Sequence, residues 1–147
     1  MIDIRKNRLD YGELLKPRDD YRLITGFATT YSLDLHTLLA VPVALCYAKA
    51  LDGEFTEENR FDVLDAIQQV DQLIKVYCQK GKIKVPKEHN RLFAFLESAV
   101  HEILPASPFS SFHPTVWLLR YESEFDAYYR VIILSRNLTF DRSWDLA

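Results

Sequence analysis

The chain has 147 residues, of which 48% are hydrophobic and 27% are charged, and its formal net charge is −3. This length allows one domain with a core of its own and is short for two, and the composition is ordinary for a globular protein. The net charge excludes a surface coated with basic residues for nucleic acid, but it leaves room for a local phosphate site.

The N-terminal part of the sequence is predicted to be an arm followed by the first strand of a single domain. Residues 1–20 mix basic, acidic and polar side chains with one proline, and they carry no motif. Residues 21–147 are assigned to the domain. Its first strand is predicted over 21–27, with Gly26 allowing a bend or a close approach at the strand end.

Two helices are predicted after this strand. The first begins at a hydroxyl N-cap and should be kinked or split at Pro42, because proline removes one backbone donor and clashes with the preceding turn. The candidate caps are Thr29, Thr30 and Ser32. The second helix starts near Thr56 and carries apolar residues at three-residue spacing from Phe61 to Val70. That spacing is typical of an amphipathic helix.

Strands and a further helix are predicted next. The run 73–78 is strand-like, and residues 83–85 are predicted to form a short strand that Pro86 ends. A long helix is predicted over 88–104, where leucine, alanine and isoleucine make one stripe and Pro105 follows. This alternation favours an α/β fold, in which helices cover a sheet.

The C-terminal part of the sequence predicts a β-hairpin. Two runs rich in Val, Ile, Leu, Trp and Tyr, over 112–121 and 129–139, flank the acidic segment 122–126. An antiparallel return brings the start of the first strand next to the end of the second. Side chains two residues apart share one face of a strand, so the hairpin is expected to end in a polar cluster. Its members are His113, Thr115, Ser135 and Asn137.

This hairpin resembles the catalytic signature of the phospholipase D superfamily, in which His-x-Lys on one strand is followed by Ser or Gly and by Asn after the returning strand. His113, Ser135 and Asn137 match that signature, whereas Thr115 stands where the family has lysine. The Ser-Arg-Asn-Leu-Thr ending is most similar to the tyrosyl-DNA phosphodiesterase branch and to bacterial phospholipase D-like nucleases. The resemblance is concentrated in residues 112–145. It implies a phospholipase D-like half, an α/β fold with a mixed β-sheet flanked by helices in an α/β/α sandwich.

The resemblance also implies a reaction. In the family two such motifs meet, one histidine attacks phosphorus to give a phosphohistidine, and the other protonates the leaving oxygen and then activates water. No metal or other cofactor is required. By resemblance, His113 and Asn137 are the catalytic residues of a nuclease-like phosphodiesterase. Thr115 and Ser135 contact its substrate, a phosphodiester of the kind found in nucleic acid.

One motif is half of such a site. Activity then requires a homodimer that joins two His113 side chains, or a second phospholipase D-like half that this chain lacks. Because the sequence stops at Ala147, soon after the hairpin, we expect the domain to be truncated at its C-terminal end. The alternative is a non-catalytic, degenerate module for protein interaction or weak phosphate-ligand binding. Thr115 favours this alternative, since threonine cannot neutralise a phosphate, whereas His113 with Asn137 favours the enzyme.

A basic cluster around the short predicted strand has two interpretations. Its members are Lys80, Lys82, Lys84, Lys87 and Arg91. In one interpretation Lys80 and Lys82 bind the backbone of a nucleic-acid substrate. In the other, which we favour, the lysines of a solvated hairpin protect an edge strand. The histidines outside the signature, His36, His89 and His101, are too far apart in sequence to predict a metal site.

The sequence predicts a cytoplasmic protein without a membrane segment. Cys46 and Cys78 lack CxxC spacing, which fits two reduced thiols. The opening residues are charged rather than apolar, so no secretory signal is predicted. The longest apolar run, 38–48, contains proline and is too short to span a bilayer.

Overall fold

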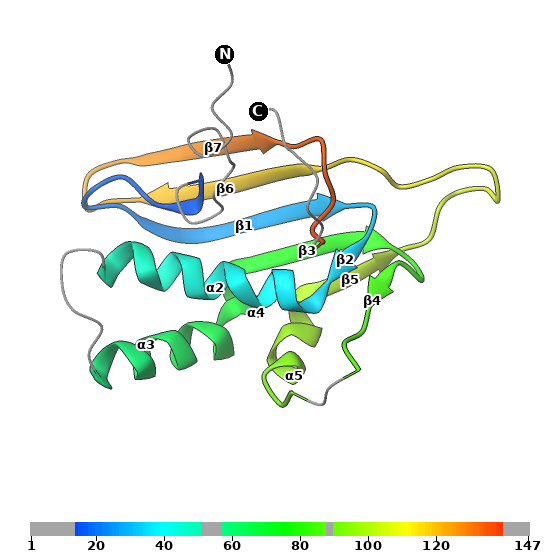
Figure 1. The fold of residues 1–147 in the computed structure, drawn as a ribbon. Coiled ribbons are helices and arrows are strands. Elements are labelled where there is room, and N and C mark those ends of the chain that lie inside the picture. Colours follow the sequence, from blue (N-terminus) through cyan, green and yellow to red (C-terminus); the bar gives the residue numbers. More distant parts are fainter. Residues whose placement is uncertain (1–13, 51–56, 88–89, 140–147) are drawn as a thin grey trace, which may run out of the picture.

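The computed structural model describes residues 14–50, 57–87 and 90–139. Its centre is a five-stranded sheet with the strand order β5-β3-β1-β6-β7, and helices pack beside it (Figure 1). The strands of this sheet are β1 (Arg22–Thr30), β3 (Ile74–Gln79), β5 (Val100–Ile103), β6 (Val116–Glu122) and β7 (Ala127–Ile133). The helices are α2 (Leu35–Ala50), α3 (Glu57–Gln68), α4 (Val70–Leu73), α5 (Phe93–Leu96) and the 3-10 turn η1 (Glu97–Ala99). A separate two-stranded parallel sheet is formed by β2 (Leu33–Asp34) and β4 (Ile83–Lys84).

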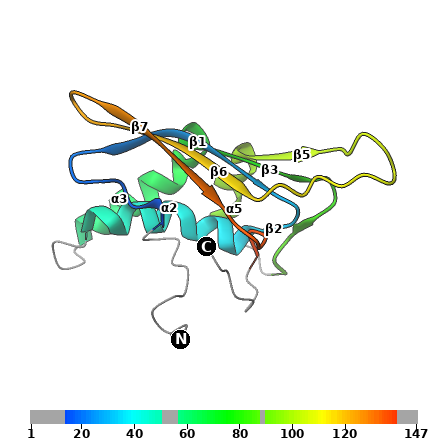
Figure 2. The same cartoon turned by 90° about the horizontal axis from the view of Figure 1, so that it is seen from above.

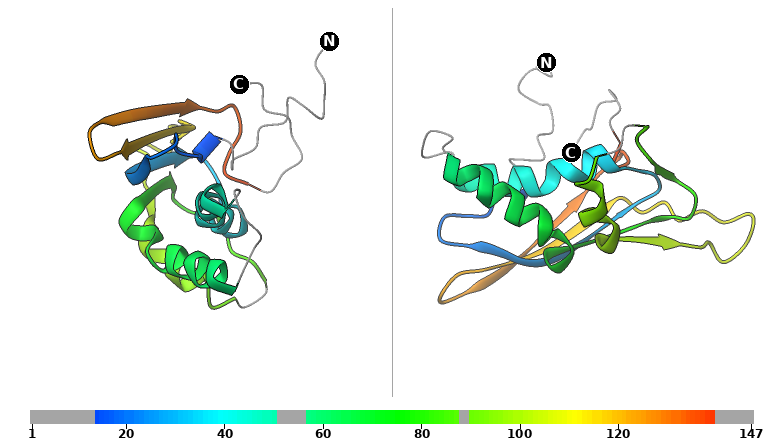
Figure 3. Two further views of the ribbon diagram at one scale, coloured as in Figure 1. Left: turned by 90° about the vertical axis from the view of Figure 1, so that its left-hand side faces the viewer. Right: turned by 90° about the horizontal axis from the view of Figure 1, so that it is seen from below.

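The main sheet is mixed. β1 pairs in parallel with β3, and β3 with β5, whereas β6 is antiparallel to β1 and β7 is antiparallel to β6. The prediction of a mixed sheet flanked by helices is therefore confirmed. The helices lie together on one face of the sheet, and in the described ranges the opposite face carries none (Figure 3). The described residues therefore form two layers and not the expected α/β/α sandwich.

The core lies between the sheet and these helices. Alternate residues of β3 and β6 point into it, so that Val76 and Trp117 are fully buried while their neighbours along the strands are partly exposed. Leu38 and Val41 of α2 and Leu96 of α5 belong to the same buried cluster. This one-sided burial leaves the outer face of the sheet open, where alternate residues of β7 are exposed.

Cys78, on β3, is a free thiol inside this core. Burial, reinforced by the Glu102 carboxylate, raises the pKa of the Cys78 thiol to about 11. The thiol therefore stays protonated and unreactive at neutral pH. The side chain of Cys46 lies outside the described residues.

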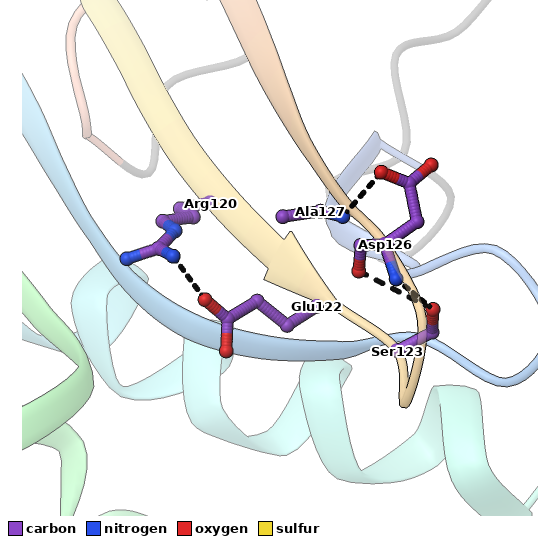
Figure 4. A network of polar contacts seen from close by, with 5 residues as sticks. All are labelled: Arg120, Glu122, Ser123, Asp126 and Ala127. Carbon is purple, nitrogen blue, oxygen red and sulfur yellow. Dashed lines mark hydrogen bonds and ion pairs between the residues drawn. The ribbon is translucent and has the colours of Figure 1, made fainter.

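β6 and β7 form the predicted hairpin, and the seven residues of each strand pair in register. The hydroxyl of Ser123 closes the turn by accepting the N–H of Asp126 at 3.1 Å (Figure 4). The carboxylate of Asp126 accepts the N–H of Ala127 at 2.7 Å. Arg120 and Glu122 form an ion pair beside this turn. The acidic segment is thus a tight turn held by its own side chains.

The segment 14–18, which is part of the predicted arm, is held against this hairpin. Leu15 is fully buried, and its carbonyl accepts the hydroxyl of Tyr121 at 2.8 Å. The guanidinium of Arg130 donates to the carbonyls of the two residues that flank Leu15, at 2.5 and 2.7 Å. Arg130 also lies over the Tyr121 ring, 5.2 Å from its centroid. Because these bonds use backbone carbonyls, they fix the path of the segment.

The start of α2 differs from the prediction. β1 continues to Thr30, and Asp34 caps α2 by accepting the His36 N–H at 2.9 Å. The hydroxyl of Thr30 is used instead at the end of the sheet, where it is fully buried. α2 then continues through Pro42 to Ala50 without being split. In the ranges that the structure describes, no helix is long and apolar enough to cross a membrane.

The single long helix predicted over 88–104 is wrong. In the described part of this segment, α5 covers only 93–96, η1 adds a tight turn, and 100–103 form the strand β5. β5 is the edge strand of the main sheet and pairs in parallel with β3. This pairing with a distant segment outweighs the helical spacing of the sequence, as tertiary contacts often outweigh local preference.

Gly26→Ala is expected to destabilise the fold. A methyl group here would lie 2.5 Å from the Cδ2 atom of Leu119 and 2.9 Å from the backbone oxygen of Leu118. We expect the free energy of unfolding, measured by urea denaturation, to fall by about 1–3 kcal/mol. Thr25→Ala, at an exposed position of the same strand, is the control and should cost less. An unchanged urea midpoint for Gly26→Ala would contradict the close approach of β1 to β6.

The buried hydroxyl of Tyr121 should make stability depend on pH in strong base. Burial raises the pKa of Tyr121 from 10.0 to about 12, although the nearby Arg130 lowers it. The folded chain therefore holds this proton more tightly than the unfolded chain. The resulting stabilisation is fully present below pH 10 and is lost as the pH rises towards 12. We expect the free energy of unfolding to fall by about 1.4 kcal/mol per pH unit in this window.

The measurement is urea denaturation at a series of pH values. Tyr121→Phe should remove this part of the slope, because phenylalanine has no proton to lose. Tyr129→Phe, at an exposed position of β7, should keep the slope of the parent chain. If all three chains show the same slope, the buried hydroxyl is not its source.

Candidate functional site

The order of the strands favours a site at the carboxyl end of β1. The chain builds β1, β3 and β5 outwards in one direction and then returns to the other side of β1 with β6. The carboxyl ends of the parallel strands β1 and β3 therefore lie at the same end of the sheet as the start of β6, and ligands of α/β sheets commonly bind outside the carboxyl ends of the strands. Tyr31 is the first residue after β1, and the segment that enters β6 passes the same end of the sheet (Figures 1 and 2).

Tyr31 connects two residues of the predicted polar cluster, His113 and Asn137, with Lys82 of the basic cluster. The ring of His113 stacks on the Tyr31 ring, with 5.1 Å between the centroids and 21° between the planes. The ammonium nitrogen of Lys82 lies 5.3 Å from the centroid of the same ring. The side-chain oxygen of Asn137 accepts the backbone N–H of Tyr31 at 3.2 Å. An exposed imidazole, a cation and an amide therefore surround one aromatic residue.

Asn137 is oriented by the buried end of β1. The hydroxyl of Thr30 donates to the carbonyl of Ser32 at 2.9 Å and accepts the N–H of Leu138 at 3.0 Å. The side-chain oxygen of Asn137 lies 3.4 Å from this hydroxyl. Because that oxygen also accepts the Tyr31 N–H, it faces β1, and the NH2 group is the end of the amide that can donate to a ligand.

Gln79, the last residue of β3, ties the parts of this cluster together. Its N–H donates to the carbonyl of Tyr31 at 3.2 Å. Its side-chain oxygen accepts the N–H of Phe112, the residue before His113, at 2.8 Å. Its own carbonyl accepts the N–H of Lys82 at 3.1 Å. Sequence reasoning missed both Gln79 and Tyr31, although their position at the carboxyl ends of two parallel strands could have drawn attention to them.

The other predicted site residues are placed differently. Thr115 is 7% exposed, and its carbonyl accepts the N–H of Leu134 at 2.9 Å. We expected it to share one polar face with His113, but Thr115 is buried whereas His113 is exposed. Ser135 is exposed just beyond β7, and Lys80 is exposed in the β3–β4 turn. Contact of Thr115, Ser135 and Lys80 with a substrate stays a prediction.

The remaining basic and histidine residues belong to separate parts of the fold. The ammonium of Lys84 lies 3.7 Å from the carboxylate of the buried Asp34, and His36 lies 3.4 Å from the same carboxylate. His101 stacks on a tyrosine ring of β3 at 5.2 Å. His89 lies outside the described residues. Among those described, no three His, Cys, Asp or Glu side chains lie together as a metal site requires.

Comparison with known proteins gives a distant structural likeness. No protein-family model matches the sequence, and no curated protein matches it. Among solved structures, yeast tyrosyl-DNA phosphodiesterase is similar at 16% sequence identity and a TM-score of 0.46, over 80% of this chain and 22% of that chain. A mutant of yeast tyrosyl-DNA phosphodiesterase 1 has the same identity and coverage with a TM-score of 0.45. The chain spans about a fifth of the length of these enzymes, and we base its function on its own residues.

Proposed function

We propose that this chain is one half of a phospholipase D-like phosphodiesterase, which binds a phosphodiester such as nucleic acid at the Tyr31 end of the sheet. The convergence of His113, Asn137 and Lys82 on Tyr31 is the observation that supports this best. The three side chains are a nucleophile, a neutral hydrogen-bond donor and a cation. Phosphoryl transfer through a histidine uses these kinds of group.

In the proposed reaction, a ring nitrogen of His113 forms a bond to phosphorus while the bond from phosphorus to the leaving oxygen breaks. A second histidine gives its proton to that oxygen and then takes a proton from the water that hydrolyses the phosphohistidine. Negative charge grows on the non-bridging oxygens, so donors already held in place lower the barrier. Asn137 is such a donor, because the Tyr31 N–H holds the oxygen end of its amide.

The second histidine comes, in this proposal, from a second copy of the chain or from a second phospholipase D-like half. The outer face of β7 offers an apolar surface for such packing. Tyr129, Val131 and Ile133 are 65%, 60% and 71% exposed. Ile133 pairs with Val116, which follows His113 by three residues. The apolar surface therefore extends to the same end of the sheet as the site.

A second candidate function is a non-catalytic interaction module. The neutral, buried Thr115 adds no charge to the site, and an exposed apolar face also suits a protein partner. In this case the chain binds a partner protein and holds phosphate ligands only weakly. The two functions differ in whether His113 and Asn137 determine the binding of an anion.

A short single-stranded oligonucleotide is expected to bind the chain through His113 and Asn137. Fluorescence anisotropy measures the dissociation constant at low salt, where charge contacts are least screened. We expect His113→Ala to raise this constant about tenfold. Asn137→Asp should raise it at least as much, because a carboxylate repels phosphate yet keeps an oxygen that accepts the Tyr31 N–H.

The matched controls are His101→Ala and Asn90→Ala, which remove an exposed histidine and an exposed asparagine elsewhere. Both should leave the dissociation constant unchanged. Thermal melting of each variant verifies that the fold is kept. Equal binding by the parent chain, His113→Ala and Asn137→Asp would exclude a phosphate site here and favour the interaction module.

Self-association is expected if a second copy completes the site. Sedimentation should show a dimer whose fraction rises with concentration, and Ile133→Asp should abolish it by placing a charge in the apolar face. Phe61→Asp in α3 is the control, because Phe61 is 72% exposed on the helical side and should not matter. A strict monomer at high concentration would exclude the homodimer and leave a second half as the source of the second histidine.

A further inference from the structure

The backbone of Lys82, in the β3–β4 turn, is held in a fixed position. Gly81 has a φ of +73°, in the left-handed region that favours glycine. Its N–H donates to the Glu102 carboxylate at 2.7 Å. The N–H of Lys82 donates to the carbonyl of Gln79 at 3.1 Å, and the Lys82 carbonyl accepts the N–H of Leu33 at 3.1 Å. Hydrogen bonds of its N–H and its carbonyl therefore fix the direction in which the Lys82 side chain leaves the backbone.

From this position the ammonium of Lys82 reaches the ring of Tyr31, 5.3 Å from its centroid. A cation over an aromatic ring that is not fully buried gains about 0.5–1 kcal/mol, which biases the Lys82 side chain towards the site without locking it there. His113 stacks on the same ring at 5.1 Å. Both distances are measured to the same ring centroid, so the ammonium nitrogen and the imidazole centroid can be no farther apart than the two distances added together. The flexible four-carbon stem of lysine can shorten this separation when an anion binds.

The position at which the resembled signature has its lysine is poorly placed to supply charge in this fold. Thr115 stands directly before β6 and is buried, two residues ahead of Trp117, which is fully buried in the core. A side chain at position 115 is therefore directed into the protein interior, whereas the His113 side chain is exposed at the end of the sheet. Positive charge beside His113 needs another source.

We propose that Lys82 is the cationic residue of the phosphate site, in place of the lysine that is absent at Thr115, and that Tyr31 positions Lys82 beside His113. This inference rests on the proposed function and adds the source of its positive charge. In this role the Lys82 ammonium binds the non-bridging oxygens of the phosphodiester. Tyr31 does not touch the ligand, but holds the cation and the imidazole on one ring.

The first test compares Lys82→Gln with Lys80→Gln. Both variants remove one exposed lysine from the same turn, so they change the net charge equally. With the short oligonucleotide, Lys82→Gln should raise the dissociation constant about tenfold. It should also make the slope of log affinity against log salt shallower by about 0.7, the value for one phosphate contact on a single strand. Lys80→Gln should change both quantities much less, and equal effects of the two variants would overturn the proposal.

The second test concerns Tyr31 as a positioning residue. Tyr31→Phe keeps the ring and should bind like the parent chain. Tyr31→Leu should raise the dissociation constant about two- to fivefold, which is less than Lys82→Gln, because it removes the contact that biases the lysine but keeps the lysine itself. Loss of the stacked ring should also shift the NMR resonances of the His113 imidazole in Tyr31→Leu. Combining Tyr31→Leu with Lys82→Gln should add little, because both changes remove the same contact. Fully additive losses would show that Tyr31 does not act through Lys82.

The outcomes separate this inference from the function on which it rests. If His113→Ala and Asn137→Asp weaken oligonucleotide binding while Lys82→Gln has no more effect than Lys80→Gln, the phosphate site stands and Lys82 is not its cation. If none of these variants weakens binding, the phosphate site itself is excluded. Thermal melting of the Tyr31 and Lys82 variants distinguishes loss of the site from loss of the fold.

Discussion

The buried hydroxyl of Thr30 is the contact on which the candidate site depends. A polar group that leaves water without finding a partner costs about 1–3 kcal/mol, so a buried hydroxyl at a strand end must draw other segments towards it. Thr30 donates to Ser32 and accepts from Leu138, which joins the end of β1 to the segment after β7. Asn137, next to Leu138, is thereby brought against the N–H of Tyr31. The same hydrogen bond that satisfies the buried Thr30 hydroxyl thus helps to position the Asn137 amide of the candidate site.

Gln79 does the same on the other side of β1. The side-chain amide of Gln79, at the end of β3, takes no part in the strand pairing and is free to bond another segment. Its oxygen accepts the backbone N–H of Phe112, in the segment that leads to β6. Its backbone bonds to Tyr31 and Lys82 bring the end of β1 and the β3–β4 turn together. Four chain segments therefore meet at one end of the sheet through hydrogen bonds that fix backbone positions. His113 and Lys82 are carried there by segments that the sheet itself holds.

The parts of the fold that the sequence predicted correctly are those that local patterns encode. The hairpin follows from two apolar runs and a turn within about thirty residues, and its register is that of a simple return. β5 was missed because its structure depends on parallel pairing with a segment more than twenty residues earlier. The cap of α2 was assigned to hydroxyls at 29–32 because threonine and serine cap helices well. Thr30 is needed in the sheet end, so Asp34 caps the helix instead.

The candidate site was predictable in its chemistry and not in its assembly. His113 and Asn137 were selected by the resemblance of the hairpin to the phospholipase D signature, and Lys82 by its place in a basic cluster, for which a solvated hairpin was the favoured interpretation. Tyr31 contributes a ring face and a backbone N–H, and no spacing rule marks either one. What would have found it is the general rule that residues at the carboxyl ends of parallel strands commonly line ligand sites.

A cation supplied from a turn has a physical consequence for the proposed site. Lys82 is exposed, so water and salt screen its attraction to a phosphate far more than they would screen that of a buried lysine. Packing of a second copy or a second half over this end of the sheet would exclude water from the same contact and strengthen it. The second histidine and the full effect of the Lys82 charge would then arrive together. A single chain should therefore hold an anion weakly, and the assembled pair should both bind it firmly and react with it.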